Sequence, residues 1–175
     1  MKTTIIGLGL IGGSLAKELR KMKFTTELVG VDVNEKHAQQ AIKLGLVDRM
    51  ETMEKALSNA DLVIIAIPVD KELEVLPEVL DTINANTTVT DMGSTKKEIN
   101  EKVKNHINRK NFVAAHPMSG TENSGPTAAL EGLFRGKIAI ICDQEESGPQ
   151  HLALVEKMLQ GLGMDIAYMS SDEQD

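Results

Sequence analysis

His116 is the residue whose type and position best suit proton transfer. It follows the apolar run Val113-Ala114-Ala115 and opens a segment rich in glycine and proline that extends to Pro126. An imidazole has an ordinary pKa of about 6.5, so it can accept a proton at neutral pH. Oxidation of an alcohol by hydride loss needs a positioned base to remove the hydroxyl proton. We therefore predict that His116 is a general base, rather than a histidine that only hydrogen-bonds its own loop.

A glycine-rich loop near the N-terminus predicts a site for the pyrophosphate of a dinucleotide. The apolar run at 3–6 leads into Gly7-Leu8-Gly9-Leu10-Ile11-Gly12, and a helical pattern follows. This is G-x-G-x-x-G between a strand and a helix, the context in which the motif binds dinucleotides. The first glycine permits a tight turn, the second lets the backbone approach the pyrophosphate, and the third lets the helix pack against the strand. The N–H groups that open the helix would then face the phosphates.

Asp32 indicates which dinucleotide is bound. It ends the second apolar run, Leu28-Val29-Gly30-Val31, twenty positions after the last glycine of the motif. A carboxylate there can accept hydrogen bonds from the ribose hydroxyls of the adenosine and would repel a 2′-phosphate. Neither Val33 nor Asn34 can hold such a phosphate as an arginine would. The sequence therefore predicts NAD rather than NADP, although Asp32 can also be a solvated carboxylate or the cap of a helix that begins near Glu35.

A third polar segment, Asp91-Met92-Gly93-Ser94-Thr95-Lys96, follows another apolar run. Ser94 can hydrogen-bond His116, a substrate hydroxyl or the nicotinamide amide, and it can also cap the helix expected after it. Asp91 can orient Ser94 or its loop. Lys96 is predicted to be a solvated lysine of the first helical turn.

Short apolar runs alternate with longer amphipathic segments along the chain. Strands are expected near 2–6, 27–32, 61–67, 87–91, 112–115, 137–142 and 164–168. Helices are expected over 11–22, 35–44, 71–83, 96–108 and 148–161. Apolar runs without alternation are typical of parallel strands that are buried on both faces. The pattern predicts a single doubly wound (Rossmann) α/β domain over 1–175 with a mainly parallel sheet, a nucleotide-binding core of about 1–168, and the start of a truncated connection at 169–175.

Such a sheet binds its ligands outside the carboxyl ends of its strands. The loops that follow the third, fourth and fifth expected strands contain Pro68, Ser94 and His116, so these residues should lie beside the glycine loop. Pro68 is therefore a candidate for the cofactor site. Thr121 and Glu122 lie further along the last loop and are candidates for the substrate site, although Glu122 can equally be an exposed loop charge.

Composition excludes several classes of partner. A net charge of −7 and an aromatic content of 2% disfavour binding of nucleic acid, which needs cations and stacking platforms. The longest apolar stretch, 62–69, is too short to cross a bilayer. Cys142 is the only cysteine and lies in an apolar run, which favours a buried residue in a reducing, cytoplasmic setting.

No metal site is predicted. His, Cys and acidic residues form no cluster at ligand spacing, and hydride transfer to NAD needs no metal. The remaining histidines fall in polar helical segments and are predicted to be solvated: His37, His106 and His151.

Three motifs give the chain a resemblance to a known family. They are Gly-Leu-Gly-Leu-Ile-Gly-Gly-Ser-Leu-Ala at 7–16, Asp-Met-Gly-Ser-Thr-Lys at 91–96 and His-Pro-Met-Ser-Gly-Thr-Glu-Asn-Ser-Gly at 116–125. In this order and spacing the chain resembles the prephenate dehydrogenase family of tyrosine biosynthesis over nearly its whole length. The last motif is the most specific, although Ser119 stands where alanine is common in the family.

The resemblance implies oxidative decarboxylation of prephenate to 4-hydroxyphenylpyruvate, with NAD as the hydride acceptor. His116 would match the histidine that takes the proton of the ring hydroxyl. Ser94 would match the serine that supports that histidine and the nicotinamide. Glu122 would match a loop acid near the substrate.

Members of this family continue into an all-helical C-terminal domain that dimerises and supplies further substrate-binding side chains. The chain ends at Asp175, so the resemblance implies a homodimeric full-length protein and a fragment that alone is inactive or weakly active. Within the chain, Lys96 and Arg135 are the nearest cations for the two carboxylates of prephenate, and neither is convincing in that role.

Other functions fit the same motifs less well. An arogenate-specific dehydrogenase would share all three motifs. A 3-hydroxyacid dehydrogenase would share the glycine loop but not the block that begins at His116. A non-catalytic NAD-binding module would give His116 no role and is the interpretation that the sequence favours least.

Overall fold

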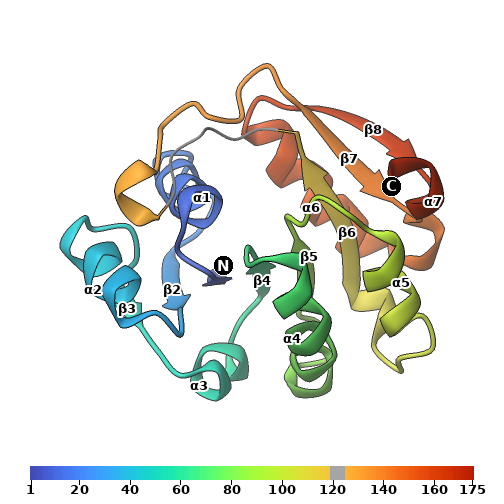
Figure 1. Cartoon of the computed structure of the whole chain (residues 1–175), viewed down its shortest axis with the longest axis horizontal. Helices are drawn as coiled ribbons and strands as arrows, with labels where there is room; N and C mark the ends of the chain where they lie inside the picture. Colours follow the sequence, from blue (N-terminus) through green and yellow to red (C-terminus); the bar gives the residue numbers. More distant parts are fainter. Residues whose placement is uncertain (119–124) are drawn as a thin grey trace.

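The apolar runs pair into one sheet, and the amphipathic segments form helices on both of its faces (Figure 1). A computed structural model describes residues 1–118 and 125–175. The strands are β1 (Lys2–Ile6), β2 (Glu27–Val31), β3 (Arg49–Met50), β4 (Leu62–Ile65), β5 (Thr88–Asp91), β6 (Phe112–Pro117), β7 (Ile138–Cys142) and β8 (Asp165–Met169). The α-helices are α1 (Leu10–Lys21), α2 (Glu35–Lys43), α3 (Met53–Ser58), α4 (Val69–Thr82), α5 (Lys97–Val103), α6 (Pro149–Gly161) and α7 (Ser171–Gln174). Three short 3₁₀ segments are η1 (Arg109–Asn111), η2 (Pro126–Ala128) and η3 (Gln144–Glu146).

The strand order is β3-β2-β1-β4-β5-β6-β7-β8. Strands β1 to β6 are mutually parallel, β7 runs antiparallel to β6, and β8 is parallel to β7. The chain winds outward from β1 in both directions, so the order reverses between β1 and β4, which is where such sheets bind ligands. The predicted doubly wound, mainly parallel α/β fold is confirmed.

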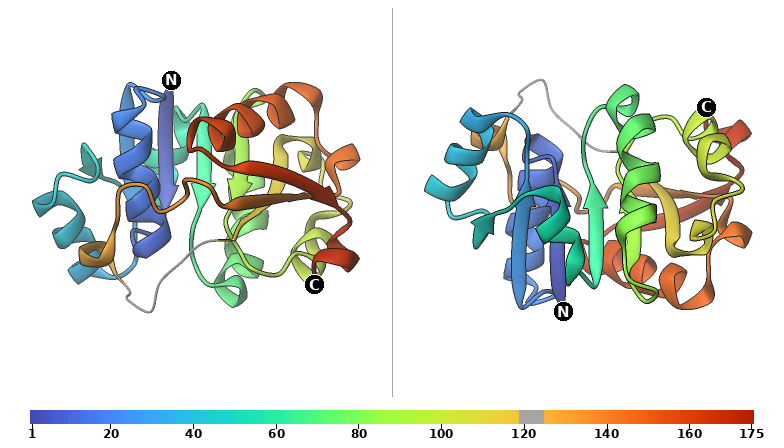
Figure 2. Two further views of the ribbon diagram at one scale, coloured as in Figure 1. Left: turned by 90° about the horizontal axis from the view of Figure 1, so that it is seen from above. Right: turned by 90° about the horizontal axis from the view of Figure 1, so that it is seen from below.

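Two hydrophobic clusters cover the two faces of the sheet. In β4, Leu62 and Ile64 belong to one cluster, and Val63 and Ile65 belong to the other, because successive side chains of a strand point to opposite faces. Residues of α1, α2 and α6 complete the first cluster, and residues of α3, α4 and α5 complete the second (Figure 2). This double coverage explains why the strands lack apolar–polar alternation.

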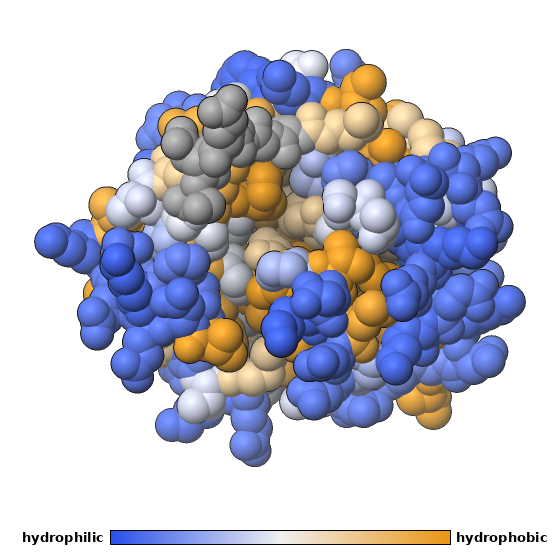
Figure 3. Space-filling model, in the orientation of Figure 1, coloured by the Kyte–Doolittle hydropathy of each residue, from blue (hydrophilic) through white to orange (hydrophobic). Residues whose placement is uncertain are grey.

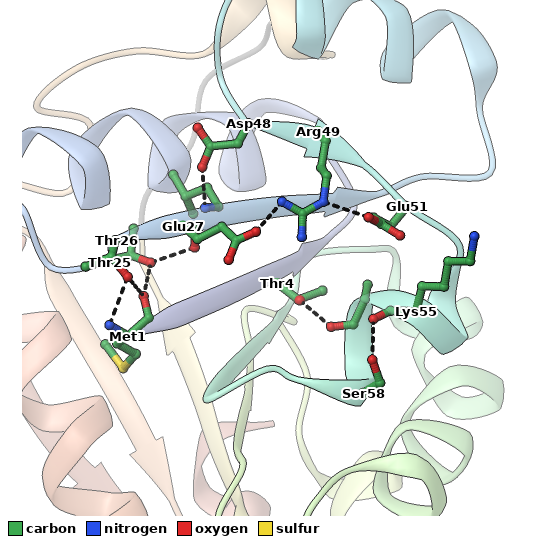
Figure 4. A network of polar contacts seen from close by, with 12 residues as sticks. Met1, Thr4, Thr25, Thr26, Glu27, Asp48, Arg49, Glu51, Lys55 and Ser58 are labelled. Carbon is green, nitrogen blue, oxygen red and sulfur yellow. Dashed lines mark hydrogen bonds and ion pairs between the residues drawn. The ribbon is translucent and has the colours of Figure 1, made fainter.

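The sequence did not predict β3, which has only two residues and no apolar run. Polar contacts hold this edge of the sheet instead, as Figure 4 shows. The Arg49 guanidinium pairs with Glu27 on β2, and its Nε donates to the Glu51 carboxylate at 2.6 Å. The Asp48 carboxylate accepts the backbone N–H of Leu28 at 2.8 Å, and this hydrogen bond lowers the pKa of Asp48.

Other boundaries also differ from the predicted ones. Helix α5 ends at Val103 rather than near 108, and the short helices α3 and α7 were not predicted. Within 1–118 and 125–175, none of the helices is both long and apolar enough to cross a membrane.

Candidate active site

The glycine loop joins β1 to α1 and has the shape that the motif predicts. Gly7 has a φ of +97°, a backbone conformation that residues other than glycine rarely adopt. A Cβ on Gly12 would overlap the carbonyl oxygen of Gly7, so only glycine lets α1 begin this close to the turn. A Cβ on Gly9, in contrast, would meet no described atom within 4 Å. The first and third glycines are therefore needed for the fold, whereas the second keeps an approach to the backbone open.

The N-terminus of α1 suits an anion. Its N-cap is Gly9, the described part of the chain supplies no side-chain cap, and no acidic residue lies in the first turn. The free N–H groups and the positive end of the helix dipole therefore face outward. A pyrophosphate is the ligand that such an end binds in this fold.

Asp32 directly follows β2 and is ordered by the glycine loop. Its Oδ2 accepts the N–H of Leu8 and its Oδ1 accepts the N–H of Asn34, both at 2.9 Å, and 10% of the side chain is exposed. The cap of α2 is Asn34, whose side chain accepts the N–H of His37. Asp32 is thus neither a solvated carboxylate nor a helix cap, and each oxygen retains a further lone pair for a ribose hydroxyl.

Two open cavities are lined by predicted cofactor residues. One is lined by residues of the glycine loop and of the segment after β4, together with one residue after β5: Gly9, Leu10, Ile11, Ala66, Ile67, Pro68 and Met92. The other lies beside Asp32 and is lined by Val31, Asp32, Val33, Met50, Glu51, Thr52, Met53 and Lys55. The first brings together four predicted cofactor residues. The second adds apolar side chains around β3 that sequence reasoning missed, because β3 itself was not predicted.

Figure 3 shows the face of the molecule toward which the carboxyl ends of the central strands point, with apolar residues exposed around its middle. His116 lies in β6, one residue before its end, and is half-buried. Burial lowers the pKa of His116, the positive charge of Lys96 lowers it further, and Asp91 opposes both. The imidazole is therefore neutral at neutral pH, the state that a proton acceptor needs.

Lys96 corrects a prediction: it is fully buried, not a solvated lysine of the first helical turn. Its ammonium pairs with the carboxylate of Asp91, which is also fully buried. Asp91 Oδ2, which pairs with Lys96, also accepts the N–H of Gly93 at 3.3 Å. Asp91 Oδ1 accepts the N–H of Ala115 at 3.0 Å. Asp91 therefore links the end of β5 to the backbone beside His116, through contacts that a charge pattern along the sequence does not show.

Glu72 of α4 is a third buried ionisable group in this cluster. A Cβ on Gly93 would lie 2.9 Å from its Oε2 and 3.2 Å from Asp91 Oδ2, so the two carboxyl groups and the glycine are close neighbours. Burial, and then the charge of Asp91, raise the pKa of Glu72 to about 10, so it is protonated in the folded chain. At any pH above 4.5, the ordinary pKa of a glutamate, unfolding releases this proton. Glu72 therefore lowers the free energy of unfolding progressively as the pH rises from 4.5 toward about 10.

The position of Glu72 carried a signal in the sequence. Leu76, Val79 and Leu80 form the buried stripe of α4, and Glu72 lies one turn before them on the same face.

The cluster of Glu72, Asp91 and Lys96 is nearly neutral overall, because it contains one cation, one carboxylate and one carboxylic acid.

Ser94 is exposed, and its hydroxyl makes no hydrogen bond to a described residue. The alternative role of Ser94, as the cap of the following helix, is excluded. The N-cap of α5 is Lys96, and the Asp175 carboxylate accepts the N–H groups of Lys96 and Lys97 at 2.6 and 3.0 Å. Thr121 and Glu122 lie outside the described residues.

The predicted solvation is wrong for His151 and holds only in part for His106 and His37. His151 is buried, and its Nδ1 lies 2.6 Å from the Thr88 hydroxyl. His106 Nε2 lies 2.7 Å from Asp81 Oδ1, with 15% of the His106 side chain exposed. His37 is partly buried, with Nδ1 3.8 Å from Asp32 Oδ2. Thr88 and Asp81 lie 63 and 25 positions away from their histidines in the sequence, so a local pattern did not reveal these two contacts.

The burial of Cys142 is confirmed. The residue lies on β7 with no exposed surface, and burial raises the pKa of its thiol to about 12. A thiol with that pKa is unreactive at neutral pH.

Comparison with known proteins agrees with these motifs. Residues 15–168 match the family model described as prephenate dehydrogenase, nucleotide-binding domain. The chain is 34% identical to the prephenate dehydrogenase of Bacillus subtilis over 180 residues, covering 100% of this chain and 48% of that protein. It therefore spans about half the length of that relative.

Solved structures give the same result. The prephenate dehydrogenase of Aquifex aeolicus, crystallised with hydroxyphenyl propionate and NAD⁺, has a TM-score of 0.90 and 31% identity over 99% of this chain and 62% of that chain. The arogenate dehydrogenase of Synechocystis has a TM-score of 0.89 and 29% identity over 99% of this chain and 61% of that chain. The chain belongs to the prephenate dehydrogenase nucleotide-binding domain family.

Proposed function

We propose that the chain binds NAD and carries the proton acceptor of an NAD-dependent prephenate dehydrogenase. The observation that carries this proposal is the arrangement around the carboxyl ends of β1, β2 and β6. An open glycine loop, a carboxylate ordered by that loop and a neutral, half-buried histidine lie at the ends of these three strands. Bound NAD would supply the hydride acceptor.

The residues present fit this cofactor. The open backbone at Gly9 and the N–H groups of Leu10 and Ile11 are proposed to hold the pyrophosphate, and Gly7 and Gly12 give the loop its shape. Ribose hydroxyls are proposed to bind Asp32. The cavity that contains Pro68 continues toward Met92, two residues before Ser94, and is proposed to receive the nicotinamide side of the cofactor.

His116 is proposed to take the proton of the ring hydroxyl while hydride leaves the ring carbon that bears this hydroxyl. Loss of carbon dioxide from the resulting dienone then gives an aromatic ring, so the second step is strongly downhill. The exposed hydroxyl of Ser94 is proposed to support His116 or the nicotinamide amide, and Thr121 and Glu122 to contact the substrate.

The structure narrows the choice of groups that could hold the two carboxylates of prephenate. Lys96 is buried and paired with Asp91, so its ammonium is committed within the fold, and Arg135 is exposed before β7. We therefore propose that residues beyond this chain complete the substrate site in a cytoplasmic homodimer. The nucleotide-binding core would be about 1–168.

Arogenate is the alternative substrate, because a relative of similar TM-score is an arogenate dehydrogenase. The test is NADH formation by the full-length protein with prephenate, arogenate and a 3-hydroxyacyl thioester, each at saturating NAD. We expect turnover of prephenate, and a preference for arogenate would change the substrate but keep the reaction. NADH formation only with the thioester, or with none of the three, would contradict the proposal.

A further inference from the structure

Gln174, on the last short helix, contacts the predicted base from the far end of the chain. Its Nε2 lies 2.9 Å from His116 Nδ1 and 2.9 Å from the carbonyl oxygen of Ser94. The contact joins two residues that are 58 positions apart in the sequence, and both are partly buried.

Helix α7, which carries Gln174, is held firmly beside α5 (Figure 1). A capping box closes its first turn: Ser170 Oγ accepts the N–H of Glu173, and the Glu173 carboxylate accepts the N–H of Ser170. The Asp143 carboxylate accepts the N–H of Ser171 at 2.9 Å. The Asp175 carboxylate also accepts the N–H groups of Lys96 and Lys97 at the start of α5. Together these contacts fix the position from which Gln174 reaches the imidazole.

The two contacts of the amide determine which of its atoms faces His116. A backbone carbonyl oxygen can only accept a hydrogen bond, so the amide atom beside Ser94 O must be the nitrogen. The same nitrogen faces His116 Nδ1, which must therefore be an acceptor. A turned amide would place Oε1 against the Ser94 oxygen with no proton between them. Since a neutral imidazole carries one N–H, the proton is on Nε2.

We propose that Gln174 is a positioning residue that holds the His116 ring through Nδ1 and keeps its neutral form protonated on Nε2. This inference rests on the proposed role of His116 as the base. Because Gln174 occupies Nδ1, Nε2 is the nitrogen left to face the substrate. Nε2 already carries the ring proton in this form. It can accept a second one only after the ring proton has been transferred to Nδ1. Proton acceptance therefore requires that the Gln174 amide turn or withdraw, which couples the position of α7 to the chemistry at His116.

Among the described residues, Lys96 and Asp91 are the charged groups that shift the pKa of His116. Gln174 is uncharged and acts differently from them. A protonated Nδ1 would place an N–H against the N–H of the amide, so the contact in this structure opposes the imidazolium form.

The test is the tautomer of His116, measured by ¹⁵N NMR on the chain without ligands. We expect a pyridine-type Nδ1 and a protonated Nε2 in the unchanged chain. In Gln174→Glu the new carboxylate can only accept, so the proton should move to Nδ1 and the pKa of His116 should rise by about 1–3 units. In Gln174→Leu the share of Nε2–H should fall toward that of a histidine free in solution.

Asp172→Asn is the matched control, because Asp172 lies on the same helix, is exposed and pairs with Lys97 rather than with His116. In this variant the tautomer of His116 should match that in the unchanged chain. A protonated Nδ1 in the unchanged chain, or the same tautomer in the two Gln174 variants, would overturn the proposal. The amide spectrum of each sample reports folding. Because no cofactor or substrate is present, the result is independent of whether the protein oxidises prephenate.

Discussion

Replacing His116 with Asn should lower kcat for NADH formation in the full-length protein by about 10²- to 10⁴-fold, the usual effect of losing a general base. Asparagine keeps a planar, hydrogen-bonding side chain at the end of β6 but cannot take a proton. The NAD affinity should change little, because the glycine loop follows β1 and Asp32 follows β2, whereas His116 lies on β6. Steady-state kinetics together with NAD titration would measure both quantities.

The pH profile adds a second criterion to this experiment. Burial and Lys96 lower the pKa of His116, so the base stays neutral to a lower pH than an ordinary histidine, and kcat/KM should fall only below about 6.5. Ser94→Ala is the control, since it removes a supporting hydroxyl and should cost less. A His116→Asn variant with near-normal kcat across neutral pH would show that His116 is not the base.

Lys96→Met should destabilise the chain by about 3–5 kcal/mol, the cost of breaking a buried ion pair from one side. Methionine fills a similar volume but leaves the buried Asp91 carboxylate without its cation, next to Glu72. Urea unfolding followed by circular dichroism would measure the free energy of unfolding.

The matched control for this variant is Lys97→Met. Lys97 is the next residue along the chain, and its ion pair with Asp172 lies on the surface, with 60% and 73% of the two side chains exposed. Such pairs contribute about 0–1 kcal/mol. Equal losses in the two variants would show that Lys96 is not a buried member of the cluster.

The fold could largely be predicted from the sequence because the information is local. Unbroken apolar runs such as β4 predict strands buried on both faces, and G-x-G-x-x-G predicts the turn at Gly7 and the close start of α1. The two-residue β3 could not be predicted this way, because it has no apolar run and Arg49 ties it to Glu27 on β2, 22 positions earlier.

The candidate site was predicted less completely, for the same physical reason. The position of Asp32 followed from its spacing to the glycine loop, and His116 followed from the end of a strand. The burial of Lys96 depends on Asp91 and on the packing of α5, and the contact of Gln174 with His116 depends on where α7 docks. Pairing between distant elements leaves no periodic pattern in the sequence.

The most direct measurement is a calorimetric titration of this chain with NAD and with NADP. NAD should bind more tightly, because Asp32 offers acceptors to the ribose hydroxyls and repels a 2′-phosphate. Asp32→Ser should weaken NAD and narrow its advantage over NADP, whereas Gly9→Ala, whose Cβ would enter the open approach to the backbone, should weaken both cofactors alike. Equal affinity for NAD and NADP in the unchanged chain, or no binding of either, would contradict the assignment of the glycine loop and Asp32 as an NAD site.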